Sequence, residues 1–176
     1  MPRPGTRLAG VILAVLVLSS ACGGQAPKAL GPSPKATASP ASQPWVQDLT
    51  FSGELNGNLR LIAPSGPGQQ SECTGHNARG GSVWAATIYG SIGGPEVWAL
   101  VMVVRGYRGA GSYDQKSASV QVHSQDNQRG WQSFYANPVA FAILRGEESG
   151  TVDATLSNLT TGKPSLKVTG KWSCKA

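Results

Sequence analysis

The sequence predicts an all-β fold, specifically a two-sheet antiparallel β-sandwich of the immunoglobulin-like kind. Two observations lead to this prediction. Beyond residue 44, apolar side chains recur with a period of two, and Gly, Pro, Ser and Asn interrupt the chain at short intervals. No segment shows a convincing apolar period of 3.6 residues, which a helix would require. We therefore expect about nine short strands in a domain that covers residues 45–176.

The last two strands show the alternation most clearly. One face of the final strand carries apolar or small side chains, namely Leu166, Val168, Gly170, Trp172 and Cys174. The strand before it repeats the pattern, with Val152, Ala154 and Leu156 facing inward and Thr151, Asp153 and Thr155 facing outward. Such alternation predicts strands that bury one face only. Asn158, Gly162 and Pro164 place a turn between the two strands.

Earlier strands follow the same pattern. Their expected ranges are residues 49–55, 58–63, 83–89, 96–105, 117–123, 130–135 and 139–144. Residues 97–104 are apolar at both odd and even positions, which face opposite sides of a strand, so we expect a central strand that is covered on both faces. A buried helix is the alternative for this run. Its β-branched residues and the flanking Gly94, Pro95 and Gly106 favour the strand.

The first 44 residues differ in composition from the rest. Arg3 and Arg7 precede an apolar run of 11 residues, 8–18, and small residues follow up to Ala21. A membrane-spanning helix needs about 20 apolar residues, so this run is typical of a signal peptide, which we expect to be removed as residues 1–21. The segment Leu18-Ser19-Ser20-Ala21-Cys22 resembles the lipobox of bacterial lipoproteins, although Ser19 stands where family members usually carry Leu.

The lipobox resemblance implies that Cys22 is alkylated with diacylglycerol and holds the protein on the outer face of the cell membrane. An ordinary signal peptide followed by an incidental cysteine is the alternative. Residues 22–44 are rich in Pro, Ala, Ser and Gly and contain no aromatic residue, so we expect a disordered tether. Its root-mean-square reach would be about 25 Å.

Three cysteines are present, and Cys22 is assigned to the lipid. Cys73 and Cys174 then remain as a pair in an exported, oxidising compartment, where we expect a disulfide. A bridge would fix the C-terminal strand to a loop after the second strand. A metal site at Cys73 and His76 is the weaker alternative, because only His123 remains as a second imidazole and no four-ligand zinc set is present.

The most distinctive local motif is the glycine-rich stretch of residues 106–113. A phosphate-binding loop would need a helix directly afterwards, and here a polar stretch and an alternating strand follow. Either Tyr107 and Tyr113 pack over the edge of the sandwich, or they form a ligand-facing loop with Arg108. Trp131 follows a polar turn, so we add it to this candidate ligand site as a partly exposed indole that could stack on a sugar.

Other features exclude several classes of function. The net charge of +6 falls to +4 once Arg3 and Arg7 are removed, and the remaining basic residues are not clustered, which argues against nucleic acid as a partner. His76 and His123 lack a nucleophile context, and the adjacent Glu147 and Glu148 are expected in a hairpin turn. We therefore expect no catalytic residues, no cofactor and no metal.

Taken whole, the chain resembles the small surface lipoproteins of actinobacteria and related bacteria, including the mycobacterial lipoprotein antigens. The resemblance rests on the lipobox, the Pro/Ala/Ser tether, a compact β domain with an early Cys73, and the Trp172-Ser173-Cys174 ending. It implies a non-enzymatic, membrane-anchored module for surface adhesion or scaffolding. A carrier or binding domain for an envelope lipid or glycan is the alternative, and a cell-wall polymer, a lipid or a surface protein is then the expected partner.

Overall fold

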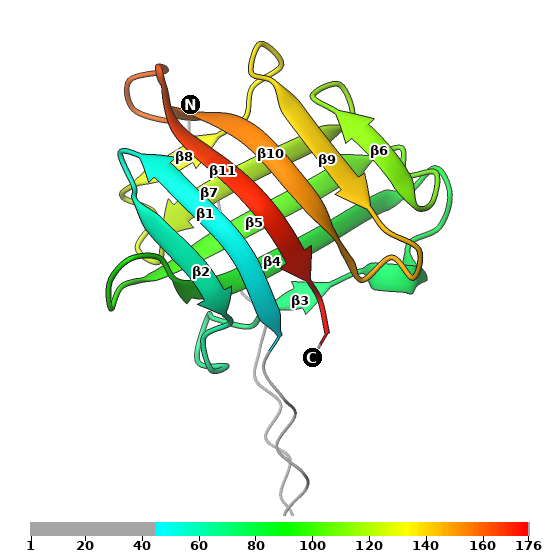
Figure 1. Ribbon diagram of the computed structural model, residues 1–176, viewed down its shortest axis with the longest axis horizontal. Helices are drawn as coiled ribbons and strands as arrows, with labels where there is room; N and C mark the ends of the chain where they lie inside the picture. Colours follow the sequence, from blue (N-terminus) through cyan, green and yellow to red (C-terminus); the bar gives the residue numbers. More distant parts are fainter. Residues whose placement is uncertain (1–44, 176) are drawn as a thin grey trace, which may run out of the picture. The chain divides into compact units, whose positions relative to one another are not determined.

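A computed structural model describes residues 45–175 and shows an all-β fold (Figure 1). The signal peptide, Cys22 and tether predicted from the sequence lie outside the described residues. Within these residues one 3₁₀ turn, η1 (Gly75–Asn77), accompanies the strands. The strands are β1 (Val46–Gly53), β2 (Gly57–Leu61), β3 (Glu72–Cys73), β4 (Val83–Ser91), β5 (Val97–Arg105), β6 (Gly111–Asp114), β7 (Ala118–Ser124), β8 (Gly130–Gln132), β9 (Val139–Ile143), β10 (Ser149–Asn158) and β11 (Pro164–Ser173).

All strand pairs are antiparallel, and together they form one hydrogen-bonded sheet. The main path runs β2-β1-β11-β10-β8-β7-β5-β4-β3. β10 connects the two parts of the sheet, because its first half pairs with β9 and its last two residues pair with β8. β9 in turn pairs with β6. The first and last strands of the domain, β1 and β11, are therefore neighbours.

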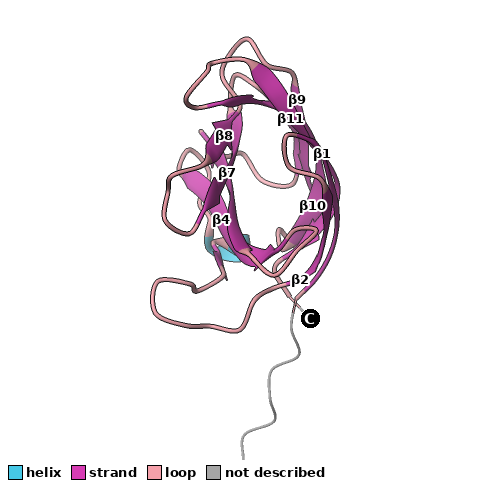
Figure 2. Ribbon diagram, turned by 90° about the vertical axis from the view of Figure 1, so that its left-hand side faces the viewer, coloured by secondary structure: helices cyan, strands magenta, loops and turns pink. Residues whose placement is uncertain are grey.

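The sheet curls until its two halves face each other (Figure 2). β1, β11, β10 and β9 lie on one side, and β4, β7 and β8 lie on the other. The edge of the first half approaches the second half just after β2, where the backbone N–H of Ala63 donates to the Tyr89 carbonyl of β4 at 2.6 Å. Gly90 allows this approach, because a Cβ there would stand 2.8 Å from the Leu61 carbonyl oxygen.

Aromatic side chains fill the space between the halves. Trp84 of β4, Phe141 of β9 and Trp172 of β11 form one cluster with ring centroids 5.0 to 5.7 Å apart. Trp98 of β5 and Trp131 of β8 form a second pair at 5.7 Å. All five rings are at most 4% exposed. The alternation seen in the sequence places these rings on the inner face of their strands, so the core is a direct consequence of that pattern.

The strand pattern agrees with the sequence prediction in most elements. The inward positions Val152, Ala154 and Leu156 of β10 are buried, as predicted, and β5 is central between β4 and β7. The outer face of β5 is not covered by a further layer, since Val101 and Val103 are only half-buried there. The prediction of two separate sheets is not confirmed, because β10 joins both halves into one. β3 and β6 are strands that the sequence prediction missed.

Candidate functional site

A groove of about 790 Å³ lies on the outer face of β6, β9, β10 and β11. Its floor is formed by Ala140 and Ala142, the two outward-facing residues of β9. Ser112 and Asp114 of β6 lie on one side of this floor, and residues of β10 and β11 lie on the other. The strand register decides this arrangement, because each alanine has a longer side chain beside it on both neighbouring strands.

Two rows of cross-strand neighbours cross the groove. The first row is Ser112, Ala142, Thr151 and Lys171, and the second is Asp114, Ala140, Asp153 and Thr169. Outward side chains that are directly opposite on neighbouring strands stand close together on the same face. Since alanine is the shortest member of each row, the sheet surface is lowest along β9. The groove is thus a product of the Val-Ala-Phe-Ala-Ile sequence of this strand.

The groove carries both signs of charge. Arg108 and Lys171 are the basic side chains in its lining, and Asp114 and Asp153 are the acidic ones, so their formal charges cancel. Asp153 also pairs with Lys167, whose Nζ lies 3.3 Å from its Oδ1. Oδ1 of Asp114 accepts a hydrogen bond from the backbone N–H of Lys116 at 3.0 Å. Each carboxylate therefore has its second oxygen, Oδ2, without a partner among the described residues.

The glycine-rich stretch forms one end of the groove. Tyr113 is 7% exposed, and its hydroxyl donates to the Gly109 carbonyl at 2.5 Å and accepts from the Arg108 backbone N–H at 3.1 Å. These two bonds hold the loop that carries Arg108 against β6. Tyr107 is buried and stacks on Tyr113 at 6.0 Å, and burial raises the pKa of its hydroxyl. The two stacked tyrosines therefore hold the backbone of residues 108 and 109 in place, and the Arg108 side chain lines the groove.

Trp131, the fourth residue of the predicted ligand site, lies elsewhere. It is buried against Trp98 at the start of β5, whereas Tyr107 follows the end of that strand. Nine residues of strand separate these ends by about 30 Å. The Trp131 indole donates to Oε2 of Glu54 at 2.8 Å, and Asn158 donates to the same oxygen at 2.7 Å. The bonds from Asn158 and Trp131 lower the pKa of Glu54.

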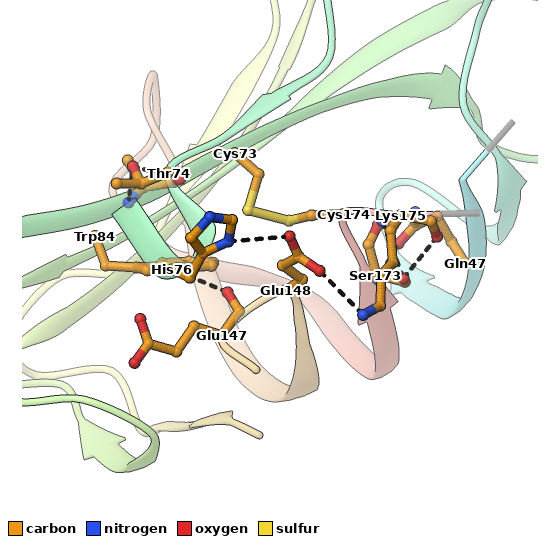
Figure 3. The surroundings of a disulfide bond; sticks show 11 residues. Gln47, Cys73, Thr74, His76, Trp84, Glu147, Glu148, Ser173, Cys174 and Lys175 are labelled. Carbon is orange, nitrogen blue, oxygen red and sulfur yellow. Dashed lines mark hydrogen bonds and ion pairs between the residues drawn. A yellow bond between two sulfur atoms is a disulfide. The ribbon is translucent and has the colours of Figure 1, made fainter. Parts of the chain in front are cut away.

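The predicted disulfide between Cys73 and Cys174 is confirmed, and a cluster of polar contacts surrounds it (Figure 3). The turn between β9 and β10 lies against it, since the Cys174 backbone N–H donates to the Glu148 carbonyl at 2.7 Å. On the other side, the Gln47 side chain exchanges two hydrogen bonds with the Ser173 backbone, at 2.7 and 2.9 Å. The bridge therefore joins β3 to the end of β11 where β1 begins.

Glu148 gives this cluster a dependence on pH. Lys175, at 3.0 Å from Oε2, and His76, at 3.4 Å from Oε1, hold the pKa of the Glu148 carboxyl below its ordinary value of 4.5. The unfolded chain binds this proton at higher pH than the folded one, so the stabilisation is present above about pH 4.5 and is lost as the pH falls through the folded pKa. We expect Glu148→Gln to reduce the loss of stability between about pH 7 and about pH 3.

Urea-unfolding midpoints measured across this pH range test the prediction. The matched control is Glu72→Gln, because Glu72 lies at the exposed strand β3 and makes no ion pair among the described residues. An unchanged pH profile for Glu148→Gln, or an equal change for Glu72→Gln, would contradict it.

The two histidines do not form a metal or nucleophile site with each other. His76 lies beside Glu148, while His123 lies on β7 with its Nδ1 3.1 Å from the Ser124 carbonyl. Within residues 45–175 no group of three His, Cys, Asp or Glu side chains gathers in a way that could hold a metal ion. Cys73 is engaged in the disulfide, which excludes the alternative of a Cys73 and His76 metal site. No helix in this part of the chain is long and apolar enough to cross a membrane.

Comparisons with known proteins identify no relative. No protein-family model matches the chain, and no match was found among curated proteins or among solved structures. The candidate site therefore rests on the geometry of the groove. Of the predicted ligand residues, Arg108 and Tyr113 line it, and Tyr107 stacks beneath. Sequence reasoning missed Ala140 and Ala142, although two alanines at the outward positions of a predicted strand were a readable signal.

Proposed function

We propose that this chain is a non-enzymatic surface module for adhesion or scaffolding, with the groove along β9 as its binding site. In this proposal a diacylglycerol on Cys22 holds it at the outer face of the cell membrane, and residues 22–44 act as the tether. The groove is the observation that carries the proposal, since it is a concave site of about 790 Å³ that is lined by basic and acidic side chains. We further propose that the two halves of the sheet correspond to the sheets of an immunoglobulin-like sandwich.

The filled interior favours this proposal over a carrier that encloses its lipid. Trp84, Phe141 and Trp172 occupy one part of the space between the halves, and Trp98 and Trp131 occupy another. A lipid carrier would need an apolar cavity, for which residues such as Val101, Val103 and Phe141 are the candidate lining. Val101 and Val103 face outward on β5, however, while Phe141 faces inward on β9, so these three do not line a common space.

The disulfide supports an exported location. Cys73 and Cys174 are 101 residues apart in the sequence and are bonded, and such bridges persist in oxidising compartments outside the cytosol. This agrees with the signal peptide that the first 21 residues suggest.

The mass of the protein extracted from its native membrane tests the anchor. We expect a chain of residues 22–176 that lacks two hydrogens, because of the disulfide, and carries the mass of the acyl groups on Cys22. A Cys22→Ser variant should lose the acyl mass and leave the membrane fraction. An unacylated N-terminus in the native protein, or membrane retention of Cys22→Ser equal to that of the native protein, would overturn the proposed anchor.

A further inference from the structure

We infer that the groove along β9 binds an uncharged glycan chain. The inference rests on the proposed function, because it names the ligand class of the proposed site. Charge is the first argument. Among the side chains that line the groove, Arg108 and Lys171 balance Asp114 and Asp153, and Lys167 beside the groove pairs with Asp153. An anionic ligand would meet the Asp114 carboxylate, and a cationic ligand would meet Arg108 and Lys171. An uncharged ligand meets neither penalty.

The available hydrogen-bonding groups are the second argument. The hydroxyls of Ser112, Thr151 and Thr169 line the groove and make no hydrogen bond with the rest of residues 45–175. Each can donate one hydrogen bond and accept others, and the Oδ2 atoms of the two aspartates can accept. A sugar hydroxyl also donates and accepts. The groove therefore offers the mixed set of partners that a polyhydroxylated ligand needs.

The backbone of β9 provides the third argument, against an extended peptide. Peptides commonly bind by adding a strand to a free sheet edge. The groove lies over β9, whose two edges are already paired with β6 and β10. Its floor offers only Ala140 and Ala142, while Val139, Phe141 and Val152 are at most 5% exposed and belong to the core. A peptide lying over β9 would therefore find neither a free strand edge there nor a pocket for a large apolar side chain. The edge of β6 that is left unpaired by the described strands lies at the border of the groove rather than over its floor.

The groove is suited to a chain of sugars rather than to a tightly enclosed monosaccharide. It reaches from β6 to β11, three strand spacings or about 14 Å, on an open outer face. The alanine methyl groups form a strip on which the C–H face of a sugar ring can rest. No exposed aromatic ring lies in this floor, so we expect weak binding, with a Kd of about 1 mM for a short oligosaccharide.

Titration of isotopically labelled protein, followed by backbone amide NMR, tests the inference. The chain of residues 22–176 with Cys22→Ser is titrated with uncharged hexasaccharides of glucose, mannose and galactose. A heparin hexasaccharide and a chitosan hexamer of equal length serve as the anionic and cationic comparisons. We expect shifts at Ala140, Ala142 and Thr151 with one or more uncharged hexasaccharides, and no comparable shifts with the charged ones.

Variants locate the binding. Ala142→Leu fills the groove from an outward position and should weaken binding of the uncharged chain by about tenfold or more. Gln121→Leu places the same side chain on the outer face of β7, four residues beyond the groove residue Ser117 and outside the lining, and should leave binding unchanged. Asp114→Asn combined with Asp153→Asn should shift preference toward the heparin hexasaccharide, because Arg108 and Lys171 then act without opposing carboxylates.

The outcomes separate the ligand class from the site. If a charged hexamer binds and Ala142→Leu removes its binding, the groove is a binding site and the uncharged glycan is wrong. If no hexamer shifts the groove residues, the inference of a glycan ligand is overturned, whereas the membrane-anchored module is judged by the mass measurement. If Ala142→Leu binds like the unaltered chain, the hexamer binds elsewhere and the groove is not its site.

Discussion

Replacing both bridged cysteines, Cys73→Ala with Cys174→Ala, should destabilise the domain by about 3 to 5 kcal/mol and lower its Tm by roughly 10–20 °C. The bond closes a sequence separation of 101 residues, so its loss frees a long loop in the unfolded chain. The bridge also joins the edge strand β3 to the end of β11, and these belong to opposite halves of the sheet. Thermal unfolding followed by circular dichroism measures the effect.

Reduction provides the control for this prediction. A reductant should lower the Tm of the native protein to that of the double variant and should leave the variant unchanged. If the double variant melted within about 3 °C of the native protein, the variant would have lost less than about 1 kcal/mol of unfolding free energy, and the bridge would not be a main source of stability.

Trp172→Ala should cost about 3 to 5 kcal/mol of unfolding free energy, as expected for removing a large buried aromatic side chain. Trp172 is 1% exposed and lies between two aromatic neighbours, 5.0 Å from the Trp84 ring and 5.5 Å from the Phe141 ring. Its removal leaves a cavity in the space where the two halves of the sheet meet. Urea unfolding followed by circular dichroism measures the change.

Two milder substitutions separate packing from hydrogen bonding in the same cluster. The Trp84 indole donates to the Glu147 carbonyl at 3.2 Å, whereas the Trp172 indole has no hydrogen-bond partner among the described residues. Trp84→Phe should therefore cost about 1 kcal/mol more than Trp172→Phe, since only the first leaves a carbonyl without its donor. Equal costs would show that the Trp84 hydrogen bond contributes nothing measurable.

Much of the fold could be predicted because its strands bury one face each. The alternation in residues 151–156 and 166–174 identified the inward side chains of β10 and β11, and these residues are buried except for Gly170, which is half-buried. β3 has two residues and β6 has four, which is too short for a period of two to be visible. The joining of the two halves into one sheet was not predictable, because it depends on β10 changing partners from β9 to β8 along its length.

The candidate site was predictable only in part. The glycine-rich stretch identified Arg108 and Tyr113, but the groove depends on strand register, which brings Ser112 and Thr151 beside Ala142 from positions far apart in the chain. Register is set by the whole sheet, and no local pattern encodes it. The disulfide was predictable because few cysteines were available, so its assignment needed no knowledge of the fold.

Mechanical tension would take a defined path through an adhesion module of this kind. Under the proposed function, the tether would join the domain at the start of β1, and a glycan over β9 would pull on the same sheet through β10 and β11. The Gln47 side chain bonds the start of β1 to the Ser173 backbone at the end of β11. The next residue, Cys174, is bonded through the disulfide to Cys73 of β3. Tension is thereby shared with the opposite half of the sheet before β1 separates. The covalent bridge then lies where a pulled domain would otherwise begin to unravel.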